Sequence, residues 1–281
     1  MSESLALPQT IGAAAVERPL PLWRRAYNLV ALRRAVILLL LAAVWQGYAV
    51  WADNPLMFPS FTETAEAFWA GIVSGGLLGK AWTSLKVLLM GYGIGVALAA
   101  TLASIAVTTR LGEDLLATLV SMFNPLPAIA LLPLALLWFG LGNPSLLFVL
   151  VHAVLWPLAL NMSSGFSSVA DTLRMAGKNY GLRGPRYVAL ILIPAAFPSI
   201  LTGLKIGWAF AWRTLIAAEL VFGVASGSGG LGWFIFENKN RLETASVFAG
   251  LGTVILIGLI VEGLVFRTIE IRTVRKWGMQ R

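Results

Sequence analysis

The chain has 281 residues, of which 58% are hydrophobic and 12% are charged. The charged fraction is about half of what soluble domains carry, so the polar surface is too small to cover a water-soluble globule. This composition excludes a disordered chain, a disulfide-stapled secreted domain and an ordinary soluble enzyme. It indicates a chain that crosses a lipid bilayer several times.

The charge balance and the metal-binding residue types exclude two further classes. Twenty-one Lys and Arg against thirteen Asp and Glu give a net charge of +8. In a soluble protein this would suggest nucleic acid, but in a membrane protein basic residues mark cytoplasmic loops, so we expect no nucleic-acid partner. Cysteine is absent and His152 is the single histidine, so we expect no metal site. His152 itself is predicted to be a buried, hydrogen-bonded structural residue.

A membrane-spanning helix needs roughly 20 mostly apolar residues. Residues 1–34 lack such a run and are predicted to be a polar cytoplasmic tail without a cleaved signal peptide. Residues 35–281 are predicted to be one all-α, polytopic transmembrane domain. Its six predicted spans cover residues 35–52, 84–107, 115–137, 145–162, 195–221 and 246–269.

The distribution of basic residues predicts the orientation. With the N-terminus inside, 15 of the 21 Lys and Arg fall in cytoplasmic segments and three fall outside. Both termini are therefore predicted to be cytoplasmic. Two external segments are longer than turns: residues 53–83 contain a helix start at Thr62-Glu63-Thr64, and residues 223–245 are rich in Gly and Ser before three aromatic residues. Residues 227–232 lack the Lys-Ser/Thr of a phosphate-binding loop and predict a turn before an interfacial helix.

Two spans have local patterns that predict how they pack. The second carries Gly91, Gly95, Ala99 and Ala103 at intervals of four, a small-residue stripe that lets helix backbones approach closely in lipid. The third contains Asn124-Pro125-Leu126-Pro127, where each proline removes a backbone donor and breaks or bends the helix. Broken helices at membrane depth occur where they line a cavity, so Asn124 is a candidate for a translocation pathway, with a plain structural kink as the alternative.

The fifth span carries ionisable residues, which are costly inside a membrane and usually face a bundle interior or an aqueous path. Lys205, Trp212 and Glu219 are spaced by seven and share a face, and Arg213 lies about 80° round from Lys205. All four are candidate pathway residues. Lys205 has the alternative of extending its amine to the inner membrane surface. Arg213 either attracts an anion or pairs with a carboxylate on another helix.

Residues 163–194 form the longest cytoplasmic connection, which predicts a structured, basic platform for a partner protein. A short amphipathic helix is expected to end at Gly181, and a second is expected to run toward Pro194. The loop resembles the motif of ATP-binding-cassette (ABC) importer permeases, Glu-Ala-Ala, three residues, Gly, nine residues, Ile, one residue, Leu-Pro. The corresponding positions here are Met175, Ala176, Gly177, Gly181, Ile191, Ile193 and Pro194.

Further segments resemble the nitrate/sulfonate/taurine branch of these permeases. They are Pro127–Pro133 with Trp138–Gly142, Pro194–Lys205, Ala217–Glu219, Gly230–Trp233 and Arg275–Gly278. The departures from the loop motif are Met175 for Glu, Gly177 for the second Ala and Ile193 for Leu. Met175 removes whatever polar contact the family's Glu makes.

The resemblance implies a type I importer transmembrane domain in a bacterial inner membrane. It implies that the ATPase-coupling residues are Met175, Ala176, Gly177, Gly181, Leu182, Arg183, Ile191 and Pro194. They would dock on the cytoplasmic ATPase, of which the assembly contains two copies. The resemblance also implies a second permease copy, a periplasmic binding protein and a small, usually anionic solute. ATP and magnesium would be bound by the ATPase, and this chain would bind no cofactor and contain no catalytic residue.

Two other classes remain as alternatives. A stand-alone carrier or channel would transport without a partner and would show inverted repeats, of which the sequence shows no clear sign. An intramembrane enzyme is disfavoured because Asp53, Asp114 and Asp171 all lie outside the predicted spans. A Ser-His pair would have to use His152, and no flanking pattern supports one.

Overall fold

The computed structural model describes residues 28–222 and 229–278, and over this part the chain is helical without β-strands. The α-helices are α2 (Val30–Ala52), α3 (Phe61–Val73), α4 (Leu77–Thr108), α5 (Arg110–Phe123), α6 (Leu132–Phe139), α7 (Asn143–Ser167), α8 (Asp171–Asn179), α9 (Gly184–Tyr187), α10 (Ile193–Ala195), α11 (Phe197–Phe222), α12 (Leu231–Asn240), α13 (Thr244–Ile260) and α14 (Arg267–Glu270). A 3-10 turn, η1 (Ala128–Leu131), precedes α6. Three segments are π-helical. The first, η2 (Val188–Leu192), joins α9 to α10, η3 (Val261–Phe266) joins α13 to α14, and η4 (Ile271–Arg275) follows α14.

Four helices are long and apolar enough to cross a bilayer: α2, α4, α7 and the continuous helix from Thr244 to Arg275. Two further segments consist of helix pairs with a sharp bend. Helix α5 meets the η1–α6 segment at 85°, and the helix from Gly184 to Ala195 meets α11 at 82°. Counting each bent pair as one span gives up to six, by length and composition.

The third predicted span, residues 115–137, corresponds to the bent pair of α5 and the η1–α6 segment. Helix α5 ends at Phe123, and the chain resumes as η1 only at Ala128. Pro125 and Pro127 have no backbone N–H to donate, so the helical ladder cannot continue through them. The predicted break at the prolines is therefore confirmed, and it separates the 14-residue helix α5 from the η1–α6 segment at an angle of 85°.

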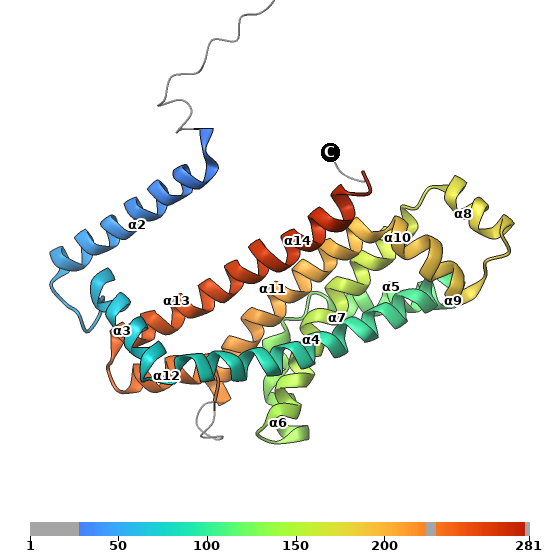
Figure 1. The fold of residues 1–281 in the computed structure, drawn as a ribbon. Coiled ribbons are helices and arrows are strands. Elements are labelled where there is room, and N and C mark those ends of the chain that lie inside the picture. Colours follow the sequence, from blue (N-terminus) through green and yellow to red (C-terminus); the bar gives the residue numbers. More distant parts are fainter. Residues whose placement is uncertain (1–27, 223–228, 279–281) are drawn as a thin grey trace, which may run out of the picture.

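Helix α7 is the centre of the bundle, between α4 and α11 (Figure 1). The stripe of small residues on α4 makes this possible. A Cβ on Gly91 would lie 2.6 Å from Leu150 Cβ, and one on Gly95 would lie 2.7 Å from Val154 Cβ. Ala99 and Ala103 of the same stripe are fully buried. The predicted packing role of this stripe is confirmed.

Helices α3 and α12 lie at one end of the bundle, and α8 and α9 lie at the other (Figure 1). The predicted helix start in the first external segment is confirmed, because Ser60 and Glu63 form a reciprocal capping box at the start of α3. The predicted aromatic helix of the second segment is α12. Residues 223–228, which include part of the Gly-rich stretch, lie outside the described residues, as does most of the predicted tail.

Helix α2 extends away from the bundle (Figure 1), and Ala49 is its single buried residue. It begins at Val30 and therefore includes the Arg33-Arg34 pair assigned to the tail. Its contacts with α3 and α13 are at its C-terminal end. Trp45 Nε1 donates to the Pro59 carbonyl at 2.9 Å, and the Trp45 ring packs against Phe58, Phe61 and Phe248. An aromatic cluster thus joins α2 to α3 and α13.

Candidate functional site

The connection between α7 and α11 forms two short helices at one end of the bundle. Helix α8 ends in a Schellman motif: Leu182 N–H donates to the Gly177 carbonyl at 3.1 Å, and Gly181 N–H donates to the Lys178 carbonyl at 2.9 Å. Gly181 has φ +74°, a conformation that favours glycine. The predicted helix end at Gly181 is therefore confirmed, and the chain turns back there into α9, η2 and α10.

Two positions of the loop motif, Gly177 and Ile191, contact each other across this turn. A Cβ on Gly177 would lie 2.9 Å from Ile191 Cγ1 and 3.1 Å from Tyr187 Cε2. Gly177 is buried, whereas its motif neighbour Met175 is 56% exposed. Glycine in place of the family's second alanine therefore has a physical reason, since η2 packs directly onto the α8 backbone.

The start of α8 is attached to the end of α7 by Arg174. Its guanidinium donates to the carbonyls of Phe166 and Val169, the latter at 3.1 Å. This arrangement leaves most of α8 accessible. Leu173 is 48% and Met175 is 56% exposed, on different sides of the helix, and Tyr180 at its C-cap is 85% exposed. The result is a rigid, partly apolar projection.

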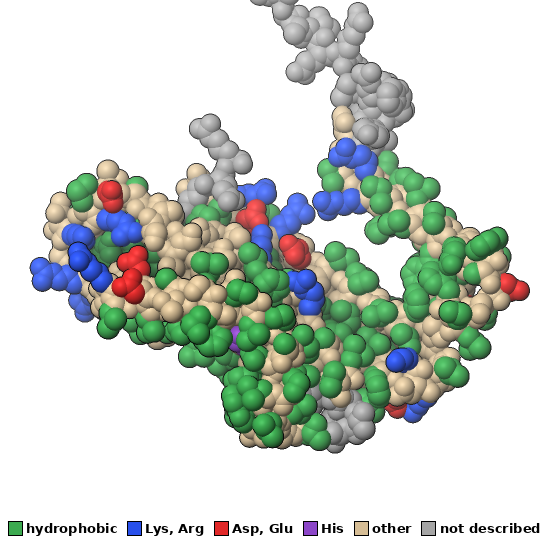
Figure 2. All heavy atoms as spheres, turned by 180° about the vertical axis from the view of Figure 1, so that it is seen from behind, with side chains coloured by type: hydrophobic (Ala, Val, Ile, Leu, Met, Phe, Trp, Pro, Cys, Tyr) green, Lys and Arg blue, Asp and Glu red, His purple; other side chains and the backbone are tan. Residues whose placement is uncertain are grey.

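Charged side chains, most of them basic, lie around this projection. Lys178, Arg183 and Arg186 are exposed, as is Asp171, and Figure 2 shows Lys and Arg at this end of the molecule with Asp and Glu among them. Of the other motif positions, Ala176, Leu182 and Pro194 are half-buried. Exposed apolar side chains among mostly basic ones form a surface suited to docking a folded partner.

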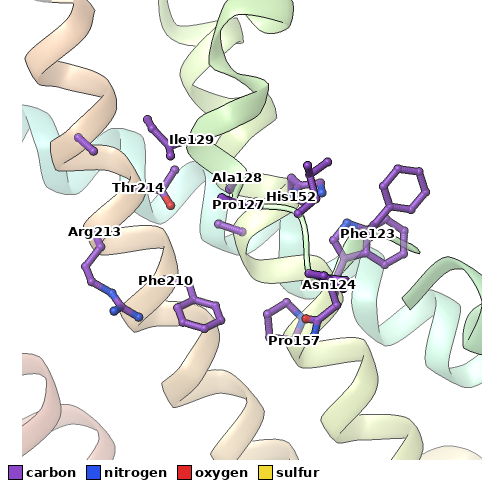
Figure 3. Close-up of a pocket in the computed structure, with 15 residues that line it drawn as sticks. Phe123, Asn124, Pro127, Ala128, Ile129, His152, Pro157, Phe210, Arg213 and Thr214 are labelled. Atoms are coloured by element: carbon purple, nitrogen blue, oxygen red, sulfur yellow. The ribbon is translucent and has the colours of Figure 1, made fainter. Parts of the chain in front are cut away.

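A second feature is a cavity of about 430 Å³ beside the break between α5 and η1. Its walls come from the Asn124–Ile129 segment, from α7 and from α11 (Figure 3). Asn124 and Arg213, two of the five predicted pathway residues, both line it. His152 and Trp156 of α7 line it as well, and sequence reasoning did not single them out as site residues.

The other three predicted pathway residues lie in contacts between helices. Lys205 Nζ pairs with Glu270 Oε2 at 2.8 Å, and Trp212 Nε1 donates to the Val254 carbonyl at 3.2 Å. Glu219 is 5% exposed and accepts hydrogen bonds from Ser84 Oγ and from the Gly232 N–H. The assignment of these three to a pathway stays a prediction.

Arg213 points away from the face that Lys205 and Glu219 occupy, as their spacing predicts. It is exposed, its Nε donates to the Ala209 carbonyl at 3.1 Å, and its guanidinium lies 5.0 Å from the centre of the Phe210 ring. Within the described residues it has no carboxylate partner. Of the two alternatives for Arg213, the carboxylate pair therefore does not form within this part of the chain.

Comparison with known proteins assigns this architecture to a family. Residues 91–268 match the family described as "Binding-protein-dependent transport system inner membrane component". A chain of Methanocaldococcus jannaschii that carries the name of an ABC transporter permease protein is 30% identical over 227 residues, covering 79% of this chain and 84% of that one.

Two relatives have names that include a solute. A chain of Escherichia coli (strain K12) named as an aliphatic sulfonates transport permease protein is 30% identical over 228 residues, covering 79% and 83% of the two chains. The nitrate import permease protein of Synechocystis sp. is 27% identical over 245 residues, covering 84% and 87%. The matched family region contains the small-residue stripe, the break after α5, the two short helices and α11. The chain belongs to the family of binding-protein-dependent transport system inner membrane components, the ABC transporter permeases.

Proposed function

We propose that this chain is the permease subunit of an ATP-driven importer for a small anion. The observation that carries the proposal is the projection formed by α8 and α9, with its exposed apolar side chains and its excess of basic ones. The names of two relatives, which include sulfonate and nitrate transport, support an anionic solute. The exposed cation Arg213 on the cavity supports the same charge.

In this proposal the membrane domain covers residues 35–281 and has six spans, with both termini and residues 1–34 in the cytoplasm. Two copies of the chain assemble with two ATPase subunits and with a periplasmic binding protein, in a bacterial inner membrane. This is the type I importer arrangement that the loop motif implies. ATP and magnesium are bound by the ATPase, and this chain supplies neither a cofactor nor a catalytic residue.

The coupling mechanism follows from the rigidity of the projection. ATP-driven closure of the ATPase dimer moves α8, whose start is held to α7 by Arg174 and whose end is held to η2 through Gly177. Since η2 continues through α10 into α11, motion of the projection is transmitted to two neighbouring helices of the bundle at once. Packed helices switch between discrete arrangements, so the cavity beside α5 opens alternately to the two sides.

Reconstitution tests the proposal. The permease, its ATPase and its binding protein would be placed in proteoliposomes, and ATP hydrolysis and uptake would be measured for nitrate, alkanesulfonates, taurine and small carboxylates. We expect one ligand-loaded binding protein to stimulate both activities. Identical hydrolysis rates with and without every loaded binding protein, or uptake that proceeds without ATP, would contradict the proposal.

A further inference from the structure

The cavity beside the α5–η1 break is rich in hydrogen-bond donors and has no acidic side chain among its described lining residues. Arg213 contributes the one cationic group of that lining. The Asn124 amide and the Thr214 hydroxyl face the same space, and within the described residues neither side chain has a hydrogen-bond partner (Figure 3). A site of this composition favours a ligand that is negatively charged and accepts hydrogen bonds.

Two buried groups next to the cavity lack partners in the described part of the chain. They are Nε2 of His152 and Nε1 of Trp156, on successive turns of α7. Trp156 is 8% exposed and stacks on Phe123 with ring centres 5.0 Å apart, and the His152 ring packs against both. A buried donor without a partner is destabilising, so a ligand that accepts a hydrogen bond from it is favoured at this position.

The contrast between the two cations of α11 indicates why Arg213 is left unpaired. Lys205, eight residues earlier, forms an ion pair with the carboxylate of Glu270. Arg213 lies about 24 Å along a helix that is about 39 Å long, far from both ends, where an unpaired charge is costly. The nearest acid on the same helix, Glu219, is turned to the opposite side and held by Ser84. The counter-charge for Arg213 therefore has to come from outside the described fold.

We propose that this cavity is an oxyanion-binding chamber within the permease, in which Arg213 binds the charged head of the solute. Asn124, Thr214, His152 and Trp156 complete the hydrogen-bonding shell, and Phe210 supplies an apolar wall. Its volume of about 430 Å³ lies within the range of about 300–1,000 Å³ that small-molecule sites occupy. The ligand class is a small, singly charged oxyanion with a compact apolar substituent, which binds here after leaving the binding protein. The role of this chamber in transport rests on the proposed import function. Its binding of an anion, by contrast, needs neither ATP nor the binding protein.

This independence defines the experiment. The full-length chain in lipid nanodiscs would be titrated calorimetrically with methanesulfonate and with dimethyl sulfone, which has nearly the same shape but no charge. We expect saturable binding of methanesulfonate, competition by nitrate and no binding of dimethyl sulfone. Equal binding of the charged and the neutral compound, or no binding of methanesulfonate, would overturn the proposal.

Variants locate the site. Arg213→Gln should weaken methanesulfonate binding at least tenfold, and Arg213→Lys should weaken it less, because it keeps the charge and loses the planar fork. His152→Phe and Trp156→Phe keep an aromatic ring and remove the nitrogen, so each should weaken binding two- to fivefold. The matched control Arg241→Gln removes an exposed cation of the α12 end and should leave binding unchanged.

Each variant would first be checked for unchanged thermal unfolding in the same nanodiscs. If Arg213→Gln proves unstable, Arg213→Lys and Trp156→Phe decide the matter. If both variants bind methanesulfonate with wild-type affinity, the proposal of an anion-binding chamber is refuted.

The two proposals fail separately. ATP-driven uptake without measurable binding of methanesulfonate would refute the chamber and leave the importer in place. Charge-selective binding at Arg213 combined with ATP-independent uptake would leave the chamber and refute the importer.

Discussion

Ser84→Ala tests how the end of the bundle next to α3 and α12 is held together. Ser84 Oγ lies 2.7 and 2.8 Å from the two carboxyl oxygens of Glu219, and it accepts a hydrogen bond of 2.8 Å from the Leu231 N–H. The Gly232 N–H donates to Glu219 Oε2 at 2.8 Å. Ser84 is fully buried and Glu219 is 5% exposed, so water does not replace a lost partner. One hydroxyl thus connects α4, α11 and the first turn of α12.

The magnitude follows from the groups that the substitution leaves unsatisfied. Alanine at position 84 deprives the Leu231 N–H of its acceptor and Glu219 of one donor. Each unsatisfied buried polar group costs about 1–3 kcal/mol, so for two groups we expect a loss of about 2–6 kcal/mol of unfolding free energy. A loss of about 2 kcal/mol lowers Tm by roughly 4–8 °C in domains of about this size.

The assay is thermal unfolding of the full-length chain in nanodiscs. The matched control is Ser167→Ala, because the Ser167 hydroxyl donates to the Ser163 carbonyl at an exposed site and its loss should shift Tm by less than about 1 °C. A shift for Ser84→Ala no larger than the control would refute the reasoning.

Glu219 offers a second check. Because Ser84 and Glu219 share one network, the double variant with Glu219→Gln should cost less than the two single substitutions together. If Glu219 acted on the solute instead of on the fold, Glu219→Gln would impair transport without lowering Tm.

Three further predictions follow from single contacts. Gly181→Ala should cost about 1 kcal/mol at its φ of +74° and should reduce ATPase binding in a co-purification assay. Lys205→Met should lower unfolding free energy by less than about 1 kcal/mol, because its ion pair with Glu270 is partly exposed, and thermal unfolding measures this. The N-cap serine of α3, chiefly through its backbone N–H and then its hydroxyl, lowers the pKa of Glu63. The stabilisation of α3 by ionised Glu63 is therefore fully present above the ordinary glutamate pKa. It is lost as the pH falls through the lowered pKa, and amide hydrogen exchange in α3 measures this loss.

Each of these predictions has its own contrary outcome. Gly47→Ala, on α2 where an added Cβ would meet no neighbouring atom within 4 Å, is the control for Gly181→Ala and should leave ATPase binding unchanged. Equal loss in both variants would contradict a specific role for the turn. A cost well above 1 kcal/mol for Lys205→Met would mean that the pair with Glu270 is effectively buried. Exchange in α3 that does not change on acidification would contradict the role of Glu63.

Local patterns in the sequence were enough to predict several parts of the fold. The apolar runs predict spanning helices, the four-residue interval of Gly91 and Gly95 predicts close packing, and Pro125 and Pro127 predict a break. Gly181 ends α8 as expected, because a left-handed position at a helix end is decided within a few residues. These features depend on neighbours in the chain, so composition and spacing are sufficient to indicate them.

Tertiary structure alone decided the partners of the polar residues. Lys205 and Glu270 are 65 residues apart, and Ser84 and Glu219 are 135 residues apart, so no periodicity could connect them. The spacing of seven correctly placed Lys205 and Glu219 on one face of α11, but it could not show which helices cover that face. The same limit applies to the cavity. His152 and Trp156 are one turn apart on α7, yet only the 85° bend after Phe123 brings Asn124 beside them and opposite Arg213.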